Sequence, residues 1–134
     1  MFMSKYENHL YSILRIVAGF LFLWHGSEKL FGFPQPAMGI PAFIAYFGGT
    51  IEFAGGILVM IGLFTRWAAF ISSGEMAFAY WMVHGTMAAL PIVNHGELAM
   101  LFCFLFLFIA AKGPGGFSID YYRSGKKRND FKMN

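Results

Sequence analysis

The stretch TIEFAGGILVMIGLFTRW, residues 50–67, decides the fold of this chain. From Thr50 to Thr65 it carries one charged side chain, Glu52, among apolar residues and glycines. An unpaired carboxylate surrounded by hydrocarbon costs several kcal/mol or takes up a proton. The sequence therefore predicts that Glu52 lies inside a helix bundle and has a partner there.

The composition of the whole chain indicates a membrane protein. Hydrophobic residues make up 57% of the 134 residues and charged residues 13%, whereas a soluble domain usually has about 25% charged residues. Seventeen Phe, nine Met and sixteen Gly suit helices in lipid, where bulky side chains face acyl chains and small ones let backbones approach. The net charge of +3 does not indicate nucleic-acid binding, because half of the basic residues lie in the predicted cytoplasmic tail, residues 121–134. We expect this tail to contact anionic membrane lipids.

Four apolar segments predict an all-α, integral membrane four-helix bundle formed by residues 1–120. The predicted spans are residues 10–31, 42–64, 67–84 and 94–112. At ~1.5 Å per residue, such segments approach or exceed the ~30 Å thickness of the hydrocarbon core. The run GFPQPAMGIP, with three Pro and two Gly, predicts a loop between the first two spans. No small-residue cleavage site follows the first span, so we expect it to be retained rather than removed as a signal peptide.

Basic residues set the expected orientation. If four helices alternate in direction, Lys5, Arg66 and Lys112 fall on the side of the basic tail, and Lys29 falls on the opposite side. The positive-inside rule then predicts that both termini are cytoplasmic.

Two further charges lie within the predicted spans. Counting along the helices places Glu75 at a depth similar to that of Glu52, and Arg15 is the cation predicted to pair with both. Two carboxylates beside one arginine suit a structural network, but they also suit a ligand site or a proton relay. The sequence leaves these alternatives open.

Glycines accompany Glu52 on one stripe of the second span. Gly48 and Gly56 lie four residues before and after Glu52, and Gly49, Gly55 and Gly62 widen the stripe. Such a stripe predicts close approach of another helix, either within the chain or in a homo-oligomer.

A second group of polar residues is expected at the outer membrane face. Its members are His25, Glu28, Lys29, His84, His95 and Glu97. They could bind a divalent metal or the oxygens of a quinone, or serve as ordinary interfacial residues. No HExxH or paired CxxC signature is present, so a metal site is not predicted. The lone Cys103 excludes a disulfide within the chain.

Three motifs resemble the DoxX family of small four-helix membrane proteins, which is related to the DoxD subunit of thiosulfate:quinone oxidoreductase. The motifs are LRIVAGFLFLWHGSEKLFGF (14–33), IEFAGGILVMIGLFTRWAA (51–69) and GPGGFSID (113–120). The resemblance matches Arg15, His25, Gly26 and Lys29 in the first motif, and Glu52, Gly55, Gly56, Gly62, Thr65 and Arg66 in the second. It implies a location in the bacterial cytoplasmic membrane and a link to sulfur-compound oxidation, quinone reduction, or resistance to oxidative and thiol stress.

Two functional hypotheses follow. In the first, the chain is a membrane subunit of a redox system that holds a quinone, while a partner subunit supplies electrons. Its expected ligand-binding or proton-relay residues are Arg15, Glu52, Glu75, His25, Lys29 and Glu97. In the second, the chain is a non-catalytic scaffold, small-molecule carrier or receptor. Proton-coupled transport is a third alternative, although four helices are few for a transporter. The sequence contains no complete active site.

Overall fold

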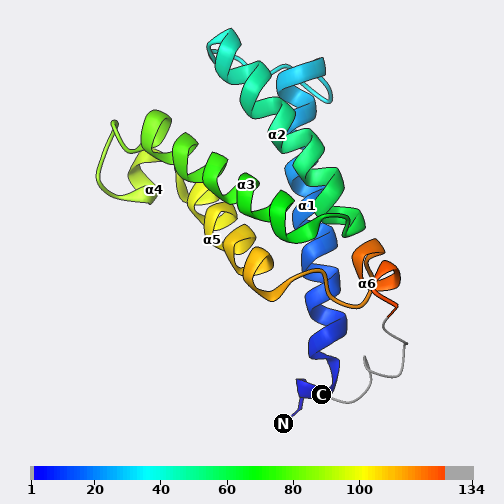
Figure 1. Cartoon of the computed structure of the whole chain (residues 1–134). Coiled ribbons are helices and arrows are strands. Elements are labelled where there is room, and N and C mark those ends of the chain that lie inside the picture. Colours follow the sequence, from blue (N-terminus) through cyan, green and yellow to red (C-terminus); the bar gives the residue numbers. More distant parts are fainter. Residues whose placement is uncertain (1, 126–134) are drawn as a thin grey trace.

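The computed structural model describes residues 2–125, and all of their regular secondary structure is helical (Figure 1). The long helices are α1 (Glu7–Phe31), α2 (Ala42–Ile61), α3 (Thr65–Ala79) and α5 (Glu97–Lys112). The short elements are a 3-10 turn, η1 (Ser4–Tyr6), a π-helical turn, η2 (Tyr80–His84), and the helices α4 (Pro91–Asn94) and α6 (Ile119–Arg123). Most of the basic tail, residues 126–134, lies outside the described residues.

The lengths of the helices depend on local breaks in the sequence. By length and composition, the helical segment Ser4–Phe31 and helix α2 can each cross a membrane. Helix α2 ends before the predicted boundary at residue 64, because Gly62 adopts a left-handed conformation with φ of 71°. Helix α3 continues directly into η2, so residues 65–84 form one helical run that includes the third predicted span. The fourth predicted span is interrupted at His95 and Gly96, before α5 begins.

The long helices are arranged as two pairs. Helix α1 packs along α2, helix α3 packs along α5, and α2 contacts α3 to join the pairs. In Figure 1 the pairs lie close together where α3 begins, and they diverge toward α4. The α1–α2 loop and α4 lie at the diverging ends of the two pairs (Figure 1).

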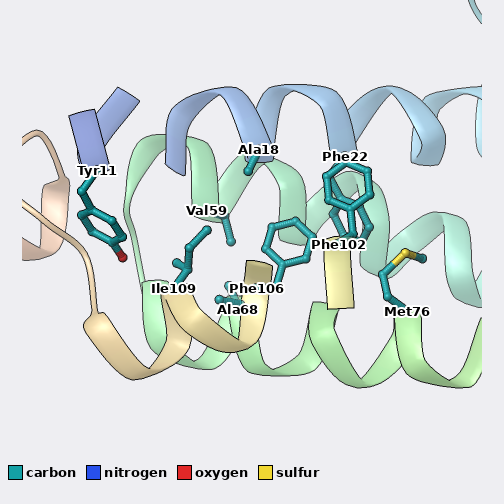
Figure 2. Packing of buried hydrophobic residues seen from close by; sticks show 10 residues of the cluster. Tyr11, Ala18, Phe22, Val59, Ala68, Met76, Phe102, Phe106 and Ile109 are labelled. Atoms are coloured by element: carbon teal, nitrogen blue, oxygen red, sulfur yellow. The ribbon is translucent and has the colours of Figure 1, made fainter. Parts of the chain in front are cut away.

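The buried core lies between the two helix pairs (Figure 2). Phe22 of α1 contacts two rings of α5, with centroid distances of 4.6 Å to Phe106 and 5.4 Å to Phe102. Phe22, Phe106 and Ile109 have no exposed surface. In lipid, such interdigitation stabilises helix association mainly through van der Waals contact. Phe22 lies seven residues from both Arg15 and Lys29, so this apolar core separates the two cations.

Glycines bring the backbones of α1 and α2 into contact. A Cβ atom on Gly26 would lie 2.3 Å from the backbone nitrogen of Phe53, and one on Gly19 would lie 2.5 Å from that of Met60. The partner helix contributes Gly49 and Gly56, where a Cβ would meet α1 at 2.9 Å and 2.6 Å. The predicted close helix approach is therefore confirmed, and it occurs within the chain.

The other glycines of α2 make room for α3. A Cβ on Gly55 would lie 2.5 Å from the Ser72 hydroxyl oxygen, and one on Gly48 would lie 3.2 Å from Glu75 Oε1. Gly48, Gly49, Gly55 and Gly56 are all buried in the monomer. The prediction that this stripe could mediate an oligomer is wrong for these four glycines, because α1 and α3 already cover them.

Candidate functional site

Arg15 lies at the end of the bundle where α2 finishes. Its side chain is fully buried. Nη1 donates hydrogen bonds to the carbonyl oxygens of Val59 and Met60, and Nη2 donates to that of Phe117. The last carbonyls of a helix lack partners within it, and a cation there also complements the helix dipole. Arg15 therefore holds the end of α2 against the segment that follows α5.

The prediction that Arg15 pairs with Glu52 and Glu75 is wrong. Arg15 and Lys29 lie 14 positions apart on one helix, which is ~21 Å along its axis. Because α2 runs antiparallel to α1, its carboxyl end lies beside Arg15 and its middle lies beside Lys29. Glu52 accordingly pairs with Lys29.

Asp120 acts on Arg15 through its charge and also binds the start of α3. Its carboxylate accepts hydrogen bonds from the backbone nitrogens of Phe64 at 3.0 Å and Thr65 at 2.8 Å, and from the Thr65 hydroxyl at 2.9 Å. It thus caps the start of α3 from a distant part of the chain. Burial alone would raise the pKa of Asp120, but the bonds from Thr65 and Phe64 and the charge of Arg123 lower the pKa below its ordinary value. We call Arg15, Thr65, Phe117 and Asp120 the clasp.

Glu52, which is buried, and Lys29, which is half-buried, form an ion pair at the other end of the core. Lys29 Nζ lies 2.5 Å from Glu52 Oε1, and the side chains are 17% and 2% exposed, respectively. Side chains on a helix point toward its amino end, so Lys29 reaches back from the last turn of α1 to the middle of α2. The other oxygen, Glu52 Oε2, is buried and has no hydrogen-bond partner among the described residues.

Glu75 of α3 adds a second carboxylate to the pair. It faces Gly48 of α2 and interacts electrostatically with both Glu52 and Lys29. Its Oε2 atom is also buried, without a hydrogen-bond partner in the described part of the chain. Lys29 is therefore ion-paired with Glu52, and each of the two carboxylates keeps one buried oxygen that can still accept a hydrogen bond or a proton.

A cavity of about 360 Å³ brings together the two polar groups that the sequence analysis treated separately. Six polar side chains line it: His25, Lys29, Glu52, Glu75, His84 and His95. The rest of the lining is mainly apolar, and Met76 and Phe102 mark the boundary with the core. This size and this mixture, an apolar wall with a few convergent polar groups, are typical of small-molecule sites.

The connection between η2 and α5 is fixed by Asn94, which is fully buried. Its amide nitrogen donates to the Ala88 carbonyl at 2.9 Å and to the Tyr80 hydroxyl at 3.2 Å, and its oxygen accepts from Gly96 N at 2.8 Å. The backbone carbonyl of Asn94 pairs with His84 Nδ1 at 2.9 Å. Because a carbonyl only accepts, Nδ1 carries the proton and the neutral ring keeps Nε2 as an acceptor.

Glu97 is not part of the cavity lining. It is exposed at the first position of α5, where a negative charge suits the helix dipole. Glu28 also stays outside the lining, although its charge acts on Glu52. Within residues 2–125, no three His, Cys, Asp or Glu side chains are placed together to hold a metal ion.

Most of the polar residues that line the cavity fall in the part of the sequence that matches a known family. A family model described as DoxX matches residues 10–85. The chain belongs to the DoxX family. The DoxX match includes five of the six polar cavity residues and Arg15 of the clasp, whereas His95 and Asp120 lie beyond it.

Three relatives match this DoxX chain over most of their length. A Haemophilus influenzae protein named "Uncharacterized protein" is 41% identical, and the match covers 88% of this chain and 93% of the relative. The Escherichia coli "Inner membrane protein YqjF" is 29% identical, with 88% and 95% covered. The Bacillus subtilis "Putative oxidoreductase CatD" is 26% identical, with 87% and 89% covered. No solved structure gives a significant match to the chain.

Sequence reasoning missed the structural roles of Asn94 and Asp120. A buried asparagine beside a proline-initiated turn is a weak signal, because asparagine is also common in exposed turns. Asp120 falls inside the GPGGFSID motif, but its partner at Thr65 is 55 positions away. Only the folded chain shows that two of the family motifs meet there.

Proposed function

We propose that this DoxX protein is a multi-pass protein of the bacterial inner membrane that binds a quinone in the cavity between its helix pairs, as the membrane subunit of a redox system. The observation that carries the proposal is the Lys29–Glu52 pair, with Glu75 beside it, in the lining of a cavity of about 360 Å³.

The surface of the helices supports a membrane location. Large apolar side chains are exposed on all four long helices, and examples are Phe20 on α1, Phe47 on α2, Phe70 on α3 and Phe104 on α5. Soluble monomers rarely expose so extensive an apolar surface. The name of the Escherichia coli relative supports the inner membrane. These observations support the proposal that α1, α2, the α3–η2 run and α5 are four spans with lipids as their neighbours. The positive-inside rule, applied to Lys5, Arg66 and Lys112, favours cytoplasmic termini.

The cavity suits both redox forms of a quinone headgroup. The carbonyl oxygens of a quinone accept hydrogen bonds, which Lys29 and a protonated nitrogen of His25 would donate. The hydroxyl groups of the reduced form donate hydrogen bonds, and the free oxygens of Glu52 and Glu75 would accept them. Lys29 thus takes the place that the sequence analysis gave to Arg15.

A redox role has support from one relative, since the Bacillus subtilis protein is named an oxidoreductase. A partner subunit would supply the electrons. Reduction of the quinone to the quinol takes up two protons, which the carboxyl groups of Glu52 and Glu75 would relay to the quinone oxygens.

The test is a quinone titration of the purified protein, monitored by thermal unfolding. A specific ligand at about 100 times its Kd stabilises by about 2.7 kcal/mol, which raises the Tm by about 8 °C at about 3 °C per kcal/mol. Lys29→Met should abolish this shift, whereas Lys5→Met, the same change at an exposed position far from the cavity, should keep it. The proposal fails if excess quinone leaves the Tm of the wild-type protein unchanged.

Mass spectrometry of protein purified from native membranes gives an independent check. A copurified quinone supports the proposed function. Recovery of phospholipid alone supports the second hypothesis, in which the chain is a scaffold or carrier.

A further inference from the structure

A second cavity, of about 260 Å³, lies between α2 and α3. Its lining is apolar except for Glu75, and it includes Phe43 and Phe47 of α2 and Phe78 of α3. These three rings are 75%, 62% and 58% exposed, so the cavity is a groove on the apolar surface of the molecule. We call it the α2–α3 groove.

The α2–α3 groove adjoins the polar cavity. Four residues line both spaces: Ile44, Glu75, Ala79 and Val83. Glu75 therefore stands at the junction, with its carboxylate near Lys29 and Glu52 on one side and the apolar groove on the other. An amphipathic molecule with its polar end at Lys29 would have an apolar path from the cavity to the surface.

Two glycines keep this path wide. A Cβ on Gly74 would have no atom within 4 Å, and one on Gly48 would meet only Glu75 Oε1. Both glycines line the groove. The glycines between α1 and α2 are required for close helix contact, but Gly74 is not. The absence of a side chain at Gly74 instead keeps the groove open.

We propose that the α2–α3 groove binds the apolar tail of the quinone whose headgroup occupies the polar cavity. This inference rests on the proposed function and names the class of ligand more closely, as a quinone with a long alkyl or prenyl tail. The shared lining argues for this occupant over a bilayer acyl chain, because a tail anchored by its own headgroup needs a groove continuous with the polar site.

The test compares two probes, a decyl-tailed benzoquinone and the same benzoquinone without the tail, on the purified full chain. Gly74→Phe should fill the groove, weakening binding of the tailed probe about tenfold or more while leaving the tailless probe within about twofold. Gly74→Ala is the matched control and should bind both probes as the wild type does. Lys29→Met should weaken both probes.

The outcomes separate the two proposals. If neither probe binds the wild-type protein, the proposed function fails and this inference fails with it. If both probes bind but Gly74→Phe affects neither, the groove holds bilayer lipid only and the inference alone is overturned.

A second measurement does not depend on the folding of Gly74→Phe. A quinone with a photoreactive group at the end of its tail should label residues of the groove, such as Phe47 and Phe78, in the wild-type protein. Labelling confined to α1 or α5 would overturn the inference.

Discussion

Replacing Arg15 with methionine should destabilise the protein strongly without altering the polar cavity. The change removes three hydrogen bonds from a buried cation to the carbonyl oxygens of Val59, Met60 and Phe117. At about 1.5 kcal/mol each, the low end for bonds to a charged group, the loss is about 4.5 kcal/mol. This corresponds to a fall in Tm of about 13 °C, at about 3 °C per kcal/mol for a chain of this size.

Thermal unfolding in detergent, with and without quinone, measures both parts of this prediction. Arg66→Met is the matched control, because Arg66 also donates to carbonyls at the end of a helix, those of Ala110 and Ala111, but is exposed. Its loss should be about 1 kcal/mol or less. The ligand-induced rise in Tm should survive in Arg15→Met. A small loss of stability together with loss of quinone binding would refute the structural role and restore Arg15 to the ligand site.

Three further predictions test other parts of the structure. The pKa of Asp120 is lowered from its ordinary value of 3.8, so its stabilisation is complete above the unfolded pKa and is lost as the pH falls through the folded pKa. As the pH is lowered from neutral to acid, the Tm of the wild type should fall by the contribution of Asp120, and the Tm of Asp120→Asn should lack this fall. The same dependence of Tm on pH in both proteins would contradict the role of Asp120 as a helix cap. Gly26→Ala should greatly reduce stability, since its Cβ would lie 2.3 Å from the backbone nitrogen of Phe53. Gly74→Ala should be neutral or stabilising by up to about 1 kcal/mol. Denaturation curves in which Gly74→Ala is the less stable variant would refute the described contact between α1 and α2. Alkaline phosphatase fused to the carboxyl terminus should be inactive and a fluorescent protein fused there bright, and the reverse would overturn the cytoplasmic assignment.

The prediction that Glu52 is enclosed is confirmed, and the prediction of its partner is wrong. The hydropathy of the second span required Glu52 to be enclosed, and its side chain is 2% exposed. Counting residues along the helices predicts Arg15 as its partner, because it places Lys29 at the membrane surface. The counting omitted the direction of side chains on a helix, which brings Lys29 back toward Glu52.

The two polar groups were recognised separately because they lie on different predicted elements. Glu52 and Glu75 were placed in the middle of their helices, and His25, His84 and His95 at the helix ends. Their meeting in one cavity depends on the divergence of the two helix pairs and on the loop fixed by Asn94. Neither feature has a local sequence pattern, whereas the glycine stripe does and was interpreted correctly as a packing surface.

The sequence by itself determined which segments are apolar and that Glu52 has to be enclosed, because an unpaired charge among apolar neighbours is costly wherever its partner comes from. Only the tertiary structure decided which charges meet. That choice follows from the register of α1 against α2. The backbone contacts at Gly19 and Gly26 fix this register, because neither position leaves room for a Cβ atom. In this register the carboxyl end of α2 meets Arg15 and Glu52 meets Lys29, so one buried cation belongs to the clasp and the other to the cavity.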